Sequence, residues 1–309
     1  MDEMTLIRKG VARNGFVLYA LNIIDQVEQE GRFGTAHAYM SSLKSLVQFT
    51  GSQRIPFRLF RSGMLNSYEN WLLGQGCCEN TAHFYLRNLR ALYNKAVAEK
   101  VIRPRENPFA GMSLESMPTR KRTLPKRWVK RIKNLKLDEG TSLAMARDMF
   151  LFSFYTCGMG FADMILLKHE QLQREMIHYE RVKTGRPVSV FANGDLLKII
   201  EKYRTDSCYI WPVLSDGASE EAHYKCYRSA LCSFNRHLKI IAEKANIPES
   251  LSSYMARHSW ATAARNQLMP TAVISSCLGH ANEKTTQIYL DSFNEGLVKR
   301  INNKVINLD

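Results

Sequence analysis

Apolar residues in the first hundred positions recur at steps of three and four, the spacing that places side chains on one face of an α-helix. The clearest pattern runs from Thr35 to Phe49 and ends at Gly51, and a second runs from about Asn80 to Lys100. Shorter patterns cover Phe16–Ile24 and Met64–Leu73. Four helices without a strand pattern predict a small all-α bundle. In the Asn80–Lys100 helix, the residues expected to face inward are Phe84, Leu86, Leu89, Leu92, Tyr93 and Val97.

The second half of the chain is also mainly helical, with one strand-rich interruption. Met176–Tyr179 and Pro187–Phe191 are typical of short strands, and Lys183-Thr184-Gly185 between them predicts a hairpin turn. Helices are expected at Ala144–Tyr155, Ala222–Ala245, Met255–Gln267 and around Ile274–Leu278. The predicted fold class is therefore mainly α, with a helical domain followed by a mostly helical domain that carries a small antiparallel sheet.

Prolines and a glycine break the helical pattern between residues 104 and 111, and Pro118 and Pro125 then bracket the basic run Arg120-Lys121-Arg122. This composition is typical of an extended linker. We expect a first domain at residues 1–115, a basic linker at 116–125, and a second domain at 126–309 whose C-terminal tail spans 294–309.

Charge points to a polyanionic partner. Lysine and arginine number 43 against 29 acidic residues, a net charge of +14, and the excess is +7 both in residues 1–123 and in the remainder. Basic residues displace counterions from phosphates, so this distribution favours a protein that holds double-stranded DNA between two domains as a clamp. A merely basic soluble protein stays an alternative. On the Asn80–Lys100 helix, Arg87, Arg90 and Lys95 lie opposite the apolar face, where they contact either solvent or DNA phosphates.

Other features narrow the class. No apolar run approaches the roughly 20 residues of a membrane span, and the N-terminus MDEMTLIRKG lacks a signal-peptide pattern, so we expect a cytoplasmic protein with no membrane partner. Seven cysteines without a C-x-x-C pair indicate reduced thiols and argue against a zinc site.

Three segments of the second domain carry candidate chemistry. Arg257 and His258 open a predicted helix in Tyr254-Met-Ala-Arg-His-Ser-Trp, Leu278-Gly279-His280 ends another, and Tyr289 follows His280 by nine residues. Lys183 lies at the tip of the predicted hairpin. Each segment has an ordinary structural interpretation as a cap, a helix end or a core tyrosine. Their order and spacing together favour one shared site.

In this order the segments resemble the signature of the phage integrase, or tyrosine recombinase, family. Residues 80–110 are similar to its SAM-like core-binding domain, and residues 124–295 are similar to its catalytic domain. The residues that make up these motifs are most similar to those of the branch carried by mobile elements and DNA invertases of gut anaerobes. The short stretch before the first helix favours a simple recombinase, such as an invertase, over a regulated phage integrase.

The resemblance implies site-specific DNA recombination, whether integration, excision or inversion. On this resemblance, Tyr289 is expected to attack a scissile phosphate and form a 3′-phosphotyrosyl bond. Arg257 is expected to hold the phosphate oxygens, and Lys183 is expected to protonate the departing 5′ oxygen. His280 is expected to bind the phosphate or to assist proton transfer from the tyrosine. The family uses no metal or other cofactor. Further contacts to phosphate or DNA are expected from Tyr254, Arg186, His258, Arg120, Lys121 and Arg122.

Two positions depart from the family pattern. Tyr254 stands where a histidine is usual, and a phenol still donates a hydrogen bond to phosphate. The position of the first catalytic arginine falls on Gly160, and the residue three places earlier, where relatives carry an arginine instead, is Cys157. Arg181 and Arg186 beside the hairpin are candidate replacements. The alternative is a DNA-binding paralogue with weak or no strand-transfer activity.

The resemblance also implies an assembly: a free monomer, a homodimer on each DNA site, and a homotetramer in the synapse. Apolar residues recur at helical spacing in the tail at 294–309, which either packs on its own domain or docks into a neighbouring protomer. A monomeric type IB topoisomerase shares the same chemistry and is a second alternative. A helical regulatory protein that never contacts DNA is a third.

Overall fold

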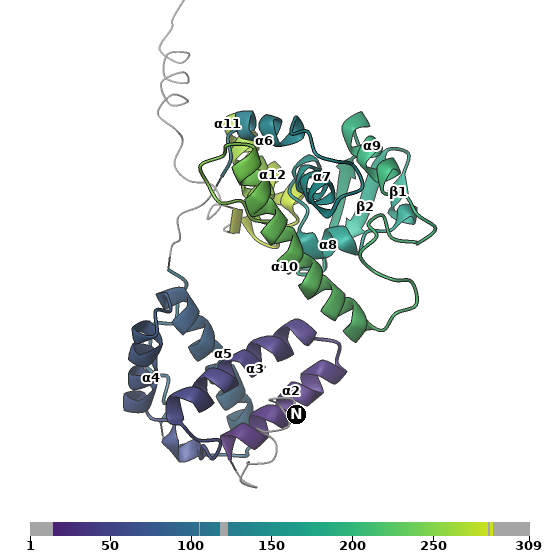
Figure 1. Cartoon of the computed structure of the whole chain (residues 1–309). Helices are drawn as coiled ribbons and strands as arrows, with labels where there is room; N and C mark the ends of the chain where they lie inside the picture. Colours follow the sequence, from purple (N-terminus) through teal and green to yellow (C-terminus); the bar gives the residue numbers. More distant parts are fainter. Residues whose placement is uncertain (1–14, 105, 118–122, 284, 287–309) are drawn as a thin grey trace, which may run out of the picture. The chain divides into compact units, whose positions relative to one another are not determined.

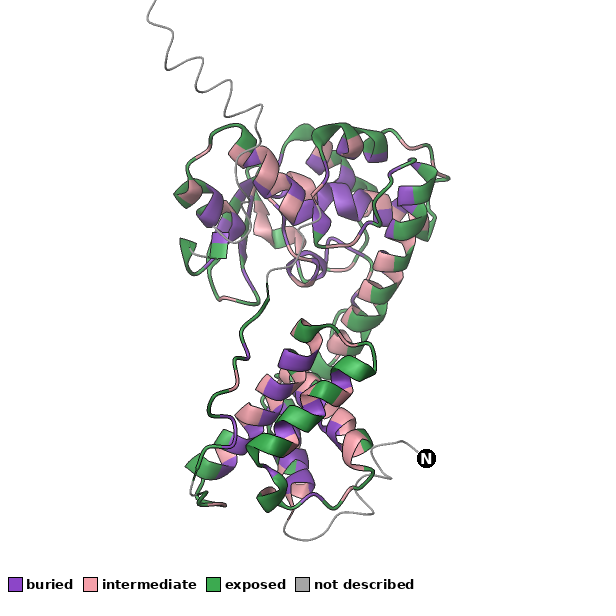
Figure 2. Cartoon of the chain, turned by 90° about the vertical axis from the view of Figure 1, so that its left-hand side faces the viewer, coloured by how far each residue is buried: buried purple, intermediate pink, exposed green. Residues whose placement is uncertain are grey.

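The computed structural model describes residues 15–104, 106–117, 123–283 and 285–286. The chain divides into two compact units, Met1–Thr119 and Arg120–Asp309, and each is described by itself (Figure 1). The buried apolar residues form a separate core in each unit (Figure 2). Within the described part of the chain, no helix is long and apolar enough to cross a membrane.

The first unit is a helical bundle, as the periodicity predicted. Helix α3 contacts α2, α4 and α5, and α5 also contacts α2 and α4. Phe16, Leu43 and Tyr68 are among the side chains that are fully buried at its centre. The helices are α2 (Phe16–Gln29), α3 (Phe33–Thr50), α4 (Ser62–Gly74) and α5 (Glu79–Ala98), with a 3-10 turn, η1, at Phe57–Leu59.

The prediction for the inner face of α5 was wrong at two positions. Leu86, Leu89, Leu92 and Tyr93 are buried, but the exposed fractions of Phe84 and Val97 are 38% and 36%. The buried face follows Ala82, Leu86, Leu89, Tyr93 and Ala96. Phe84 lies two residues from the nearest members of that row, and this is about half a turn of helix. It therefore points away from the core.

The segment that follows α5 packs back on this helix. Phe109 and Leu114 are buried in the core of the first unit. Arg87 Nη1 donates to the carbonyl of Leu114 at 2.6 Å, and His83 Nδ1 lies 2.7 Å from the carbonyl of Glu115. Asn80 bonds both the N–H and the carbonyl group of Met117. Polar side chains of α5 thus bind the segment that follows this helix as far as residue 117.

The second unit is built around helix α7, which contacts α6, α9, α10 and α11. Phe150 and Phe152 of α7 are fully buried, which explains the apolar sequence of this helix. Leu124 is buried in the same core, and its N–H donates to Ser259 Oγ at 2.8 Å. The helices are α6 (Lys126–Lys133), α7 (Ser142–Tyr155), α8 (Phe161–Ile165), α9 (Gly194–Lys202), α10 (Glu220–Lys244), α11 (Met255–Asn266) and α12 (Thr271–Leu278).

The predicted hairpin is confirmed. Strands β2 (Met176–Glu180) and β3 (Pro187–Phe191) pair antiparallel, and the two-residue strand β1 (Leu172–Gln173) extends the sheet in the order β1-β2-β3. Alternate residues of β2 and β3 are buried, as the period of a strand requires. Helix α12 contacts β3, so the hairpin and α12 are neighbours.

Candidate active site

Arg257 is the buried cation at the centre of the candidate site. It lies in the first turn of α11, and its exposed fraction is 1%. Nη1 donates to the carbonyl of Gly158 at 2.8 Å, and Nη2 donates to the carbonyl of Leu278 at 2.5 Å. Gly158 has φ +81°, and a Cβ there would lie 2.7 Å from the Cα of Arg257. Only glycine lets these two backbones approach so closely.

The turn that follows α12 collects basic side chains. Gly279 caps the helix in the left-handed conformation, with φ +61°. Its carbonyl accepts hydrogen bonds from Thr184 Oγ1 at 3.1 Å and from Arg181 Nη1 at 3.4 Å, and Arg186 Nη2 donates to the carbonyl of Ala281 at 3.0 Å. Carbonyl groups at a helix C-terminus lack partners within the helix and carry partial negative charge, so they attract cations.

Those contacts attach the β2–β3 turn to the end of α12. Within the turn, the N–H of Arg181 donates to the carbonyl of Arg186 at 2.9 Å, and the carbonyl of Arg181 accepts from Thr184 and Gly185. Lys183 lies at the exposed tip of this closed turn. The turn therefore has a fixed shape, and it presents a primary amine to solvent beside the Leu278–Ala281 turn.

His280 is buried next to these cations. Its Nδ1 lies 2.8 Å from Thr286 Oγ1. The pKa of His280 is lowered to about 4, first by burial and then by the positive charges of Arg257, Arg181 and Lys183. The imidazole is therefore neutral near pH 7 and has a lone pair with which to accept a proton.

Asp163 provides a carboxylate to the same region. It lies on the short helix α8, whose N-cap is Gly160. Its Oδ1 accepts a hydrogen bond from the N–H of Val182 at 2.9 Å, and its Oδ2 lies 3.6 Å from Nε of Arg181. Both members of this ion pair are buried. Asp163 is a site residue that the sequence did not indicate, because its partner is eighteen positions away on a different element.

Two thiols lie beside Arg257. Cys157 has φ +56°, and a hydrogen bond to Cys277 is the largest cause that raises the pKa of the Cys157 thiol. The same hydrogen bond lowers the pKa of Cys277 to about 7. Cys157, three residues before Gly160, therefore contributes a neutral thiol to the site rather than a cation.

The remaining predicted residues fall into three groups. The ring of Tyr254, which is exposed, lies 5.0 Å from that of His258, centroid to centroid. Arg90 and Lys95 are half-buried on α5, where Arg87 already binds Leu114. Tyr289, Arg120, Lys121 and Arg122 lie outside the described residues, as does the tail at 294–309. Arg257, His280, Lys183 and Arg186 meet around the Leu278–Ala281 turn.

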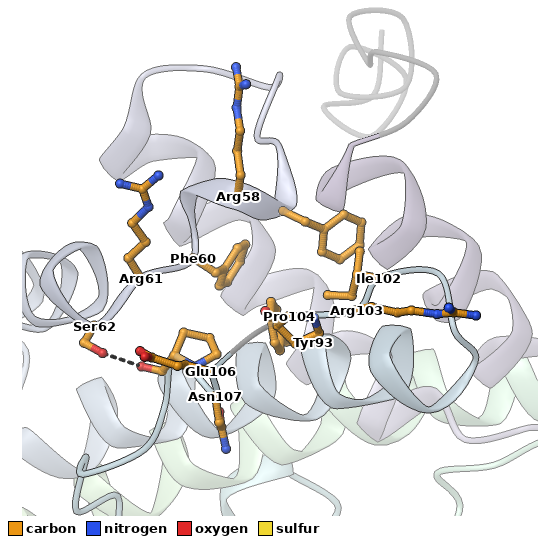
Figure 3. Close-up of a pocket in the computed structure, with 12 residues that line it drawn as sticks. Arg58, Phe60, Arg61, Ser62, Tyr93, Ile102, Arg103, Pro104, Glu106 and Asn107 are labelled. Atoms are coloured by element: carbon orange, nitrogen blue, oxygen red, sulfur yellow. Dashed lines mark hydrogen bonds between the residues drawn. The ribbon is translucent and has the colours of Figure 1, made fainter.

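The first unit has a basic hollow that the sequence did not indicate. Arg58, Arg61 and Arg103 line a cavity of about 700 Å³ that also contacts Phe60 and Tyr93. Figure 3 shows the three arginine side chains extending away from the ring of Phe60. Arg58 lies in η1, Arg61 directly precedes α4, and Arg103 follows α5, so no single helical period could have placed them together.

The chemistry of the site does not resemble that of a metal centre. In the ranges that the structure describes, no three histidine, cysteine or acidic side chains are grouped as metal ligands. The groups gathered near the Leu278–Ala281 turn are instead mainly cationic, with one buried carboxylate. Cations with donor N–H groups suit an anion such as phosphate.

Solved structures with similar folds include DNA integrases. A transposon Tn1549 integrase in complex with circular intermediate DNA has a TM-score of 0.68 at 15% identity, over 94% of this chain and 99% of that one. A lambda integrase dimer bound to a COC' core site has a TM-score of 0.67 at 16% identity, over 90% and 95% of the two chains. At these identities, the likeness concerns the fold.

Sequence comparisons give the family. The phage integrase SAM-like domain matches residues 15–113, and the phage integrase family matches residues 123–295. Tyrosine recombinase XerD of Proteus mirabilis is 25% identical over 274 residues, which is 85% of this chain and 84% of that protein. XerC of Bacillus pumilus is 22% identical over 89% and 91% of the two chains. The chain belongs to the phage integrase family of tyrosine recombinases, enzymes of site-specific DNA recombination that break and rejoin DNA.

Proposed function

We propose that this chain exchanges DNA strands through a 3′-phosphotyrosyl intermediate formed by Tyr289. The observation that carries the proposal is the gathering of Arg257, His280 and the Lys183 turn around the Leu278–Ala281 turn. His280 contacts Thr286, and Tyr289 follows Thr286 by three residues. Three residues of chain span at most about 11 Å, so the connection from Thr286 is short enough for Tyr289 to act at this cluster.

Each step balances without a cofactor. The Tyr289 oxygen forms a bond to phosphorus while the bond from phosphorus to the 5′ oxygen breaks. Neutral His280 accepts the tyrosine proton, and Lys183 gives a proton to the departing 5′ oxygen. Arg257 neutralises the charge that builds on the non-bridging oxygens, and Tyr254 donates a further hydrogen bond. A 5′ hydroxyl of the partner strand then attacks the phosphotyrosine and gives its proton to Lys183. Protonated His280 returns a proton to the departing Tyr289 oxygen, so the new strand is joined and both groups regain their first protonation state.

Double-stranded DNA is the proposed partner of both units. In the second unit, Arg186 and His258 lie beside the phosphate-binding residues and extend the contact surface. In the first unit, the basic hollow adds to Arg90 and Lys95, while Arg87 divides its donors between Leu114 and DNA. The linker contributes Arg120, Lys121 and Arg122.

We also propose a dimer on each site and a tetramer during exchange, formed from free monomers. Lambda integrase has been solved as a dimer on a core site and as a tetramer bound to a Holliday junction. The tail at 294–309 is the proposed link between protomers. Deleting it should leave single-site binding intact and remove cooperative binding and strand exchange. A truncated chain that still recombines would show that the tail serves only its own protomer.

A suicide duplex tests the proposed function. The duplex carries the inverted or direct repeats that flank the gene and a nick next to the scissile phosphate, so the cut end diffuses away and the protein–DNA adduct persists. We expect adduct from the unchanged chain and from the matched control Tyr224→Phe, and none from Tyr289→Phe. DNA affinity should be the same for all three. Adduct from Tyr289→Phe would refute the proposal.

One observation favours a second candidate function. Gly160 and Cys157 leave the site without a guanidinium at either position where the family carries its first arginine. Loss of one transition-state donor costs about 10²–10³-fold in rate, which is compatible with a DNA-binding paralogue that does not transfer strands. Tight binding of the duplex without adduct would support this candidate. Relaxation of supercoils at any sequence would instead indicate a type IB topoisomerase.

A further inference from the structure

Gly160, which has no side chain, lies beside the buried carboxylate of Asp163. A Cβ at this residue would lie 3.2 Å from Oδ2 of Asp163. An arginine at the same position, as in the family pattern, would therefore begin next to this carboxylate. Because position 160 has no side chain, Asp163 needs a different cationic partner there.

Arg181, the residue that follows β2, is that partner. Its Nε lies 3.6 Å from Oδ2 of Asp163. Its aliphatic stem crosses Gly279, where a Cβ would lie 2.9 Å from Cδ of Arg181. Glycine at 279 thus makes room for the arginine to reach the carboxylate that an arginine at 160 would have contacted.

The contacts of Arg181 leave much of its donor capacity unused. A guanidinium has five N–H donors. Among the described residues, the hydrogen bond from Nη1 to the carbonyl of Gly279 is long, at 3.4 Å, and the buried Nε has no hydrogen-bond partner. The separation from Asp163 is that of an ion pair rather than a hydrogen bond. Buried donors without good partners are costly, and an anionic ligand would satisfy them.

The position of Arg181 suits a phosphate that Arg257 also binds. Arg181 and Arg257 both lower the pKa of His280, so both cations lie close to this imidazole. They also bind adjacent carbonyl groups, those of Gly279 and Leu278. Two guanidiniums held on neighbouring backbone groups can contact different oxygens of one phosphate.

We infer that Arg181 supplies the second guanidinium that binds the scissile phosphate, in place of the arginine missing at Gly160, and that Asp163 is its positioning residue. This inference rests on the proposed function, because it concerns the same site. It gives the site two guanidiniums, Arg181 and Arg257, although neither position where the family carries its first arginine has one. It also explains why a buried carboxylate faces Gly160.

The cleavage test compares two forms of the suicide duplex, one with the ordinary phosphodiester and one with a methylphosphonate at the scissile position. In the methylphosphonate, a neutral methyl group replaces one non-bridging oxygen and removes the negative charge, so the guanidinium that neutralises this charge is no longer needed. We expect Arg181→Met to lower the rate of adduct formation by about 10²–10³-fold on the phosphodiester and by less than about tenfold on the methylphosphonate. The exposed control Arg204→Ala should behave as the unchanged chain on both.

A second variant guards against misfolding. Arg181→Met combined with Asp163→Asn leaves no buried charge unpaired, so the fold should persist. It should show the same dependence on the substrate as Arg181→Met. An equal loss on both duplexes would mean that Arg181 serves only the fold, and an unchanged rate on the phosphodiester would also overturn the inference.

Vanadate binding separates this inference from the proposed function. Orthovanadate mimics phosphate, and NMR of the His280 ring reports its binding to the full chain without DNA. We expect Arg181→Met to weaken vanadate binding at least tenfold. Undetectable binding, or unchanged affinity in the variant, would overturn the role of Arg181. Binding that depends on Arg181, in a chain that forms no adduct, would refute strand exchange by Tyr289 while supporting the role of Arg181.

Discussion

The carbonyl group of Leu278 accepts a hydrogen bond from Arg257, so the last turn of α12 fixes the arginine that begins α11. A side chain with many rotatable bonds is thereby held in one orientation before any ligand arrives. The carbonyl of Gly158, in the turn that follows α7, holds the same guanidinium. Such preorganisation lowers the free-energy cost of binding a phosphate, because little conformational entropy remains to be lost.

The backbone of Gly158 lies so close to Arg257 that a methyl group at position 158 should greatly lower the free energy of unfolding. Gly158→Ala should destabilise the second unit through its positive φ, by about 1–2 kcal/mol, and through the clash with Arg257, by about 1–3 kcal/mol more. Gly217→Ala is the matched control, because Gly217 has φ +72° and open space around it. Urea unfolding measures both. Equal losses in the two variants would show that the backbone of Arg257 moves aside at no cost.

The lowered pKa of His280 predicts that stability falls with acid. The unfolded chain takes up the histidine proton near pH 6.5, whereas the folded chain does so only near pH 4. The contribution of His280 to the free energy of unfolding is therefore complete above pH 6.5 and is lost as the pH falls to about 4. It amounts to roughly 3 kcal/mol. Urea unfolding at a series of pH values should show that the free energy of unfolding falls less steeply with decreasing pH in His280→Gln than in the unchanged chain. The same decline in both chains contradicts the lowered pKa.

If Lys183 is the general acid, a better leaving group should restore the cleavage rate of a variant that lacks this lysine. Lys183→Ala should slow cleavage by about 10²–10⁴-fold, because the departing 5′ oxygen then leaves without a proton. A duplex with sulfur at that position should be cleaved at nearly the unchanged rate, since a thiolate leaves unaided. Lys198→Ala, which removes an exposed lysine from α9, is the control and should alter neither rate. Without rescue by sulfur, Lys183 binds phosphate only.

The linker should contribute to the salt dependence of DNA binding. Each phosphate contact changes the slope of log affinity against log salt by about 0.9. Replacement of Arg120, Lys121 and Arg122 by glutamine should therefore lower that slope by about 2.7 without a change in site preference. Titration of a labelled duplex at several salt concentrations measures it. An unchanged slope means that the three side chains face solvent.

Periodicity predicted the elements that bury a whole face. The four helices of the first unit, the core helix α7 and the β2–β3 hairpin all repeat long enough to give a clear pattern. Strand β1 has two residues and α8 has five, too few for any period. Helix α6 consists largely of lysine and arginine beside Pro125, so its sequence resembles an extension of the linker.

The motifs predict which residues carry the chemistry, and the experiments above test that prediction, but the motifs do not indicate which contacts hold those residues in place. Asp163 and Arg181 meet only after α8 and the hairpin have packed, and Leu124 reaches Ser259 across 135 positions of sequence. Long-range pairs of this kind depend on tertiary packing and leave no local pattern. The arginines of the basic hollow escaped prediction for the same reason, since separate segments of the chain supply them.

Chemical mapping of the adduct tests the central claim most directly. After trapping on the suicide duplex, digestion with nuclease and trypsin leaves a short nucleotide on one peptide, which mass spectrometry identifies. The account predicts the nucleotide on Tyr289, in the peptide that spans residues 285–299. A nucleotide on Tyr254, in the peptide that spans residues 245–257, or on any other residue, would contradict it.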